Sequence, residues 1–245
     1  MAGTSAERQE IGVIKKINDA IKKNKKNPIT IVAGKTVING VIKAEKYKGR
    51  QESGSEPYTD VVIHVQKGKK IEKINCSLKG ESAPSLAGGG LRGIELAVPG
   101  LAKKFMRIAF KELKERKKLK LGDKVPDTFA KISNKDKLTI VIGNEKMGGP
   151  IHYMYIGPMN VMGKYEVEKN KLILNGKFIL AEEFAKTHDL FFRLRARRED
   201  QRFDPFAKEK DGTPKVYGVS PSKGDSAGRV NVTDKVSSKG VIVKL

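Results

Sequence analysis

The sequence predicts an α/β (α+β) fold, in which a mixed sheet is flanked by helices and followed by a basic, β-rich C-terminal extension. Two patterns predict it: isoleucines at helical spacing near the N-terminus, and short Val/Ile-rich segments bounded by turn residues. The chain has 245 residues, 38% of them hydrophobic, which suffices for one or two domain cores. We place a core domain at residues 1–143 and the extension at residues 144–245. The extension either belongs to the core domain or forms a separate one.

The first half of the chain contains one helix pattern and several strand patterns. Residues 6–26 are predicted to form a helix, because Ile14, Ile17 and Ile21 recur on one face. Asn27-Pro28 is expected to end this helix. Strands are predicted at residues 29–32, 36–42, 60–66 and 71–78. The last two strands flank a short Gly/Lys turn and are therefore expected to form a hairpin.

The second half begins after a segment of small residues at 80–94. A second helix is predicted over residues 99–119, with Pro99 near its start. Further strands are predicted at 138–142, 172–174, 191–197, 229–232 and 241–243, and a short helix at 181–187. The Gly- and Met-rich stretch at 144–163 is the best candidate for a boundary between the two parts.

Charge and cysteine content narrow the class of protein. Fifty Lys and Arg residues stand against 28 Asp and Glu residues, and the formal net charge of +22 favours a polyanionic partner. No apolar stretch approaches the ~20 residues that span a bilayer, and the N-terminus lacks the apolar region of a secretory signal, so no membrane partner is expected. Cys76 is the only cysteine, so an intrachain disulfide is excluded and an intracellular protein is favoured. Such a protein would be cytoplasmic or nucleoid-associated, and a viral origin stays open.

The predicted hairpin carries the residues with the clearest chemical meaning. Asp60 begins its first strand, and Ser77-Leu78-Lys79 ends its second. Because the strands of a hairpin run antiparallel, Asp60 and Lys79 are expected at the same end. Phosphodiester hydrolysis needs such groups: carboxylates hold a divalent cation against the phosphate, and an ammonium offsets the developing charge.

These residues resemble the PD-(D/E)XK nucleases, the superfamily with the restriction-endonuclease-like fold, in a Ser-x-Lys variant. The resemblance, over residues 6–118, implies a metal-dependent DNA endonuclease that uses Mg²⁺ or Mn²⁺. It implies that Asp60 is the principal metal ligand, Lys79 the catalytic cation and Ser77 their neighbour. Since Ser77 stands where an acid is usual, the resemblance implies a second carboxylate from Glu95 or, alternatively, Glu81.

The same resemblance implies a glutamate on the first helix, which would be Glu10 or Glu7. It also implies the order helix, strands, Asp strand, Lys strand and helix along the chain, which agrees with the predicted elements.

Arginines supply the candidate nucleic-acid contacts, because a guanidinium matches phosphate oxygens and guanine edges. The candidates are Arg92, Arg193, Arg195, Arg197, Arg198 and Arg202. Because side chains alternate along a strand, Arg193, Arg195 and Arg197 would lie on one face. DNA is the expected partner, whereas RNA and a homodimer stay open.

A non-enzymatic nucleic-acid-binding protein is the alternative function. Such a protein would be architectural or part of a particle, and it includes the case of a degenerate nuclease fold kept for binding. The net charge of +22 agrees equally well with this reading. Serine at position 77 also leaves it open, because a hydroxyl is a poorer metal ligand than a carboxylate.

Overall fold

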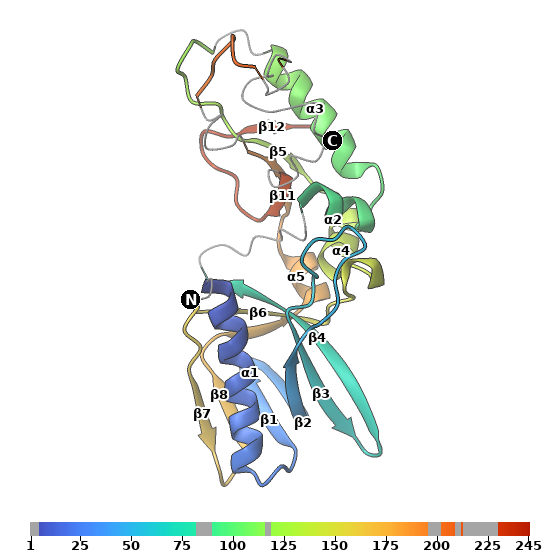
Figure 1. Cartoon of the computed structure of the whole chain (residues 1–245), viewed down its shortest axis with the longest axis vertical. Helices are drawn as coiled ribbons and strands as arrows, with labels where there is room; N and C mark the ends of the chain where they lie inside the picture. The colour runs from blue at the N-terminus through green and yellow to red at the C-terminus, as the bar shows by residue number, and fades with distance from the viewer. Residues whose placement is uncertain (1–4, 82–89, 116–118, 196–201, 209–211, 213–229) are drawn as a thin grey trace. The chain divides into compact units, whose positions relative to one another are not determined.

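A computed structural model describes residues 5–81, 90–115, 119–195, 202–208, 212 and 230–245 (Figure 1). The described residues divide into two compact units. Unit 1 lies within Met1–Glu52, Pro57–Pro84 and Val141–Thr187, and unit 2 lies within Ser53–Glu56, Ser85–Ile140 and His188–Leu245. Each unit is made of several chain segments that alternate with those of the other unit. The predicted division into residues 1–143 and 144–245 would instead make two consecutive segments.

Unit 1 is built on a mixed sheet of eight strands within the described residues, in the order β7-β8-β1-β2-β3-β4-β6-β9. These strands are β1 (Ile29–Ala33), β2 (Thr36–Lys46), β3 (Val61–Lys67), β4 (Lys70–Gly80), β6 (Tyr153–Gly157), β7 (Gly163–Glu166), β8 (Lys171–Leu174) and β9 (Lys177–Leu180). Strands β2, β3 and β4 pair antiparallel in sequence order, which confirms the predicted hairpin. Strand β6 pairs with β4 in parallel. A parallel neighbour requires a crossover connection, and the chain between β4 and β6 includes Ser85–Ile140 of unit 2.

Helix α1 (Ser5–Lys23) packs on the central strands of this sheet (Figure 1). Val13, Ile17 and Ala20 are buried at a spacing of three to four residues, so the predicted helix is confirmed, although it ends at Lys23 rather than at residue 26. The helix ends where Lys25 and Lys26 take positive φ angles of 53° and 65°. The apolar side chains under α1 form one core cluster with the inward-facing residues of the strands.

Unit 2 has a smaller mixed sheet, with four strands in its described part in the order β11-β10-β5-β12. These strands are β5 (Thr128–Lys131), β10 (Phe191–Leu194), β11 (Val230–Thr233) and β12 (Val241–Val243). Helices α2 (Gly90–Ala97) and α3 (Leu101–Glu115) pack on it. Phe105 of α3 stacks on Phe192 of β10 at a centroid distance of 5.4 Å, and both rings are fully buried.

The strand predicted over residues 138–142 is wrong, because these residues form the second half of helix α4 (Asn134–Ile142). Their β-branched side chains favour a strand by propensity. The helix is fixed instead by its start, where the Ser133 hydroxyl accepts the Asp136 N–H at 3.1 Å and donates to the Asp136 carboxylate at 2.6 Å. Burial of Ile140 and Val141 then stabilises the helical arrangement.

The remaining predictions agree with the structure to different extents. Helix α5 (Ala181–Thr187) matches its predicted bounds, and the strands at 172–174 and 241–243 are confirmed. The strand predicted over 191–197 ends at Leu194, and residues 196–197 lie outside the described residues. Strands β5, β6, β7 and β9, helix α2 and the 3-10 turn Glu145–Met147 were not predicted.

The observed fold class is the predicted one, since helices accompany two mixed sheets. Within the described part of the chain, no helix is both long and apolar enough to cross a membrane.

Candidate functional site

Asp60 lies immediately before β3 and is held in place by its neighbours. Its backbone N–H donates to the Cys76 carbonyl of β4 at 2.9 Å. The preceding residue, Thr59, is fully buried and donates its hydroxyl to the Gly148 carbonyl at 2.5 Å. The position of Asp60 is therefore set by the β3–β4 pairing and by a buried contact to the segment before β6.

The Asp60 carboxylate lies across from Ser77 on β4. Val61 pairs with Cys76, so the residues before and after this pair, Asp60 and Ser77, stand opposite each other. One oxygen, Oδ2, accepts the Leu78 N–H at 2.6 Å and the Ser77 hydroxyl at 3.1 Å. These donors fix the carboxylate against the strand, and they bring together two residues that the sequence predicted to be neighbours.

Lys79 follows on the same face of β4. Side chains alternate along a strand, so Lys79 shares its face with Ser77, whereas Leu78 belongs to the core under α1. Lys79 is half-buried and pairs with Ile156 of β6. Ser77 and Lys79 thus share the face of β4 opposite the one that α1 covers, and the Asp60 carboxylate lies beside them at the end of the β3–β4 ladder.

Gln9 on α1 anchors this end of the sheet, and it was not among the site residues predicted from the sequence. Its side chain is 2% exposed, and its Nε2 atom donates to the Gly157 carbonyl at 2.9 Å and to the Lys79 carbonyl at 3.2 Å. A longer contact of 3.4 Å reaches the Pro158 carbonyl. The signal was present in the sequence, because Gln9 continues the four-residue spacing of Val13 and Ile17 as a polar residue on an apolar helix face.

Glu10, on the same helix, forms an ion pair with Lys46 at the end of β2, with a distance of 2.8 Å between Oε2 and Nζ. The hydrogen bond to Glu10 is the largest cause that raises the pKa of Lys46, and the charges of Glu7 and Asp60 raise it further. The Lys46 ammonium is therefore within electrostatic reach of both candidate helix glutamates and of Asp60. The resemblance implied a glutamate at this position of the fold.

Glu81 is the alternative candidate for the second carboxylate, and it is nearer to Lys79 in sequence than Glu95 is. It lies just beyond β4 and is exposed. Burial is the main cause that raises the pKa of Tyr155 to about 12, and the charge of Glu81 adds to it. Glu81 thus acts electrostatically on Tyr155 in the middle of β6, whose hydroxyl donates to the Asn175 carbonyl at 3.1 Å.

Glu95, the other candidate, belongs to unit 2 and binds the start of α3. Its carboxylate oxygens accept the Gly100 N–H at 2.7 Å and the Lys103 N–H at 2.9 Å. A carboxylate at this position satisfies N–H groups that have no partner inside the helix and interacts favourably with the helix dipole. The structure therefore assigns Glu95 a capping contact, and its predicted role as a metal ligand stays a prediction.

Replacing Glu95 with alanine is expected to lower the free energy of unfolding by about 1 kcal/mol, because two N–H groups at the start of α3 lose their acceptor. Denaturant titration measures this loss. Glu95→Gln is the matched variant, since it retains one acceptor oxygen and should lose less stability. A Glu95→Gln protein with unchanged stability that had lost Mg²⁺-dependent cleavage would identify a metal ligand instead.

Metal-binding side chains of the described residues do not gather in larger groups. In residues 5–81, 90–115, 119–195, 202–208, 212 and 230–245, no three His, Cys, Asp or Glu side chains lie together as a metal-binding group. At the Asp60 end of β3 and β4, the Asp60 carboxylate and the Ser77 hydroxyl lie 3.1 Å apart.

The candidate arginines fall into three situations. Arg92, Arg195 and Arg202 are exposed, and Arg202 donates to the Gly122 carbonyl at 3.2 Å. Arg193 instead pairs with Asp127. Arg197 and Arg198 lie outside the described residues.

Comparison of the chain with protein-family models, with curated proteins and with solved structures found no match.

Proposed function

We propose that the protein is a metal-dependent DNA endonuclease whose centre lies at the Asp60 end of β3 and β4. The observation that carries this proposal is the Asp60 carboxylate fixed opposite Ser77, with Lys79 next on the same sheet face. The order of α1, the antiparallel strands β2, β3 and β4 and the following helices also agrees with the order that the resemblance implies.

The donors at this end of the sheet fit a hard divalent cation. Carboxylate and hydroxyl oxygens suit Mg²⁺ or Mn²⁺, and Mg²⁺ commonly takes only one or two protein carboxylates together with phosphate oxygens and water. Asp60 would hold the ion, with Ser77 beside it. When bound, the ion supplies Lewis-acid charge at the phosphate. Glu95 and Glu81 stay the predicted sources of a second carboxylate, and Glu10 is a third candidate because it shares Lys46 with Asp60.

The protein's own groups have distinct roles in this proposal. The Leu78 N–H and the Ser77 hydroxyl orient the Asp60 carboxylate, so that its direction is set before a ligand arrives. The Lys79 ammonium stabilises negative charge that develops on the phosphate oxygens. Gln9 positions the backbone at Lys79 through the Lys79 carbonyl. The net charge of +22 supplies the general attraction for a nucleic acid.

The test is a plasmid cleavage assay with Mg²⁺ or Mn²⁺, with EDTA as the metal-free arm. We expect the wild type to nick or linearise the plasmid only with metal, and we expect Asp60→Asn to abolish cleavage. Asparagine keeps an acceptor for the Leu78 N–H and removes the charge, so the fold should persist. Asp19→Asn is the control, because Asp19 is an exposed α1 carboxylate paired with Lys15. Cleavage that persists in EDTA or in Asp60→Asn would contradict the proposal.

A non-enzymatic nucleic-acid binder is the second candidate, and Ser77 is the observation that favours it. The position where the resemblance expects an acid holds a hydroxyl that already donates to Asp60. For such a protein, the same assay would show no cleavage with either metal, while DNA retention would weaken steeply as salt increases.

A further inference from the structure

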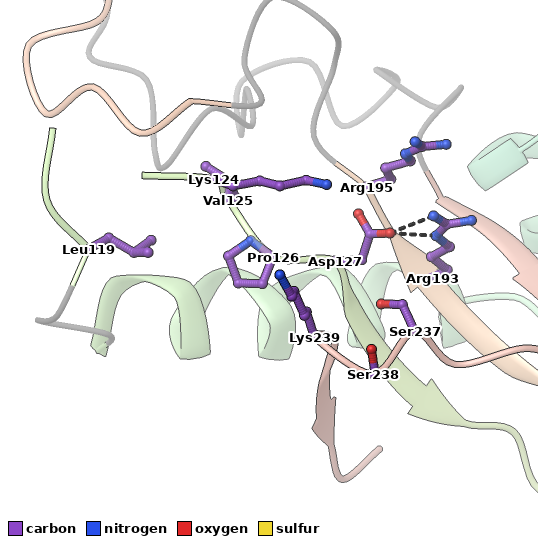
Figure 2. A pocket seen from close by; sticks show the side chains of 10 residues that line it. All are labelled: Leu119, Lys124, Val125, Pro126, Asp127, Arg193, Arg195, Ser237, Ser238 and Lys239. Carbon is purple, nitrogen blue, oxygen red and sulfur yellow. Dashed lines mark hydrogen bonds and ion pairs between the residues drawn. The ribbon is translucent and has the colours of Figure 1, made fainter. Parts of the chain in front are cut away.

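Unit 2 contains a cavity of about 440 Å³, and none of the residues that line it belongs to the proposed nuclease centre (Figure 2). Three segments that are distant in sequence line it: the chain leading into β5, the end of β10, and the connection between β11 and β12. All of these segments belong to unit 2. A volume of this size falls within the range of small-ligand sites, about 300–1,000 Å³.

An ion pair between Asp127 and Arg193 forms one wall of the cavity (Figure 2). The Arg193 Nε and Nη2 atoms donate to Asp127 Oδ2 at 2.8 and 2.5 Å. The guanidinium also lies over the Phe129 ring, 5.9 Å from its centroid. Both charged side chains are at least three-quarters buried, and each neutralises the other. The pair therefore stabilises the wall of the cavity, and the other cations in the lining are the groups available to bind a ligand.

The connection before β12 is held firmly against this wall. The Val241 N–H donates to the Asp127 carbonyl at 2.9 Å, and the Gly240 N–H donates to the Ser237 carbonyl at 2.9 Å. Gly240 also packs against the buried Phe129 ring so closely that an added Cβ would lie 2.3 Å from a ring carbon. The hydroxyls and the ammonium of Ser237, Ser238 and Lys239 are therefore presented by a fixed turn.

Positive charge exceeds negative charge in the cavity lining. Lys124, Arg195 and Lys239 line the cavity together with the Asp127–Arg193 pair, so four cations surround one carboxylate (Figure 2). Among the described residues, no carboxylate forms an ion pair with these three cations. The cavity thus holds an excess of three positive charges, with two serine hydroxyls as neutral donors.

We propose that this cavity binds a phosphate monoester. A monoester carries about −1.5 to −2 charges near neutral pH and has three acceptor oxygens, whereas each phosphodiester of a strand carries a single charge. Lysine, arginine and serine donors gathered in one cavity match the compact dianion better than they match an extended backbone. The monoester can come from the phosphorylated end of a nucleic-acid strand or from a free mononucleotide. This site goes beyond the proposed nuclease function, because it needs neither Asp60 nor a metal ion.

The test compares the binding of two short single-stranded oligonucleotides that differ only in a 5′-phosphate, using the full chain in EDTA. Fluorescence anisotropy of a 3′-labelled strand measures both affinities. We expect the wild type to bind the phosphorylated strand about tenfold more tightly, which corresponds to one charge-assisted contact. Lys124→Ala and Lys239→Ala should each reduce this preference toward unity. Lys244→Ala is the control, because Lys244 is an exposed cation of unit 2 outside the cavity lining.

Equal binding of both strands by the wild type would overturn the proposal, and so would a preference that Lys124→Ala and Lys239→Ala retain. Competition with thymidine 5′-monophosphate distinguishes the sources. Full competition identifies the monoester alone as sufficient, and weak competition shows that the strand adds contacts. Asp60→Asn should keep the preference, so failure of the nuclease proposal and failure of this one are separate results.

Discussion

Lys79→Ala is expected to lower the rate of metal-dependent DNA cleavage by about 10²- to 10³-fold, the usual loss when one charge-stabilising donor is removed from an active site. Lys79 shares its face of β4 with Ser77, whose hydroxyl contacts the Asp60 carboxylate, so in the proposed centre its ammonium would act where negative charge develops on the phosphate. Single-turnover cleavage of a labelled duplex at saturating Mg²⁺ measures the effect on the chemical step.

Lys73→Ala is the matched control for this experiment. Lys73 lies on the same strand and the same face of β4, farther from Asp60, and it is exposed. Its loss removes the same net charge from the protein and should change the cleavage rate little. Equal losses in the two variants would mean that Lys79 contributes only to general attraction of DNA, which would contradict its catalytic role.

Gln9→Leu is expected to lower the free energy of unfolding by about 2 kcal/mol and to reduce cleavage as well. Leucine fills a similar volume but leaves the carbonyls of Lys79 and Gly157 without the Gln9 donor at a buried position. The backbone that carries Lys79 then loses its tie to α1. Denaturant unfolding measures the stability, and the cleavage assay measures the second effect on the folded fraction.

Gln66→Leu controls for the change of residue type. The Gln66 side chain also donates to a backbone carbonyl, that of Gly68 at 3.1 Å, but at an exposed position. Solvent can replace that bond, so the stability should change by no more than about 0.5 kcal/mol. If Gln9→Leu were equally mild, Gln9 would not anchor the strand ends.

Local patterns were sufficient to predict part of this structure. The isoleucines of α1 and the hairpin of β3 and β4 follow from spacings within short stretches, and the hairpin places Asp60 opposite Ser77. The strand predicted at 138–142 failed because a cap at Ser133, several residues earlier, determines the conformation of the β-branched run.

Long-range partners explain what the sequence did not reveal. Strand β6 contains only five residues in a Gly- and Met-rich stretch, and its pairing with β4 is visible only in three dimensions. The spacing in α1 marks Gln9 as a polar residue on the apolar face, but its acceptors lie on two strands far from α1 in sequence, so its partners could not be predicted from neighbouring residues. Glu95 was predicted from a motif position, whereas its hydrogen bonds come from Gly100, just before α3, and from Lys103 in the first turn of α3.

The parallel pairing of β4 with β6 has a consequence for biosynthesis. Because Ser85–Ile140 lies between these strands in the chain, a polypeptide emerging from the ribosome has already exposed β3 and β4 long before β6 is made. Until Gly157 emerges, Gln9 lacks one of its acceptors, and the edge of β4 has no native neighbour. Closing so long a loop is entropically slow, so the sheet around Asp60 is completed late, only after all of Ser85–Ile140 has been translated.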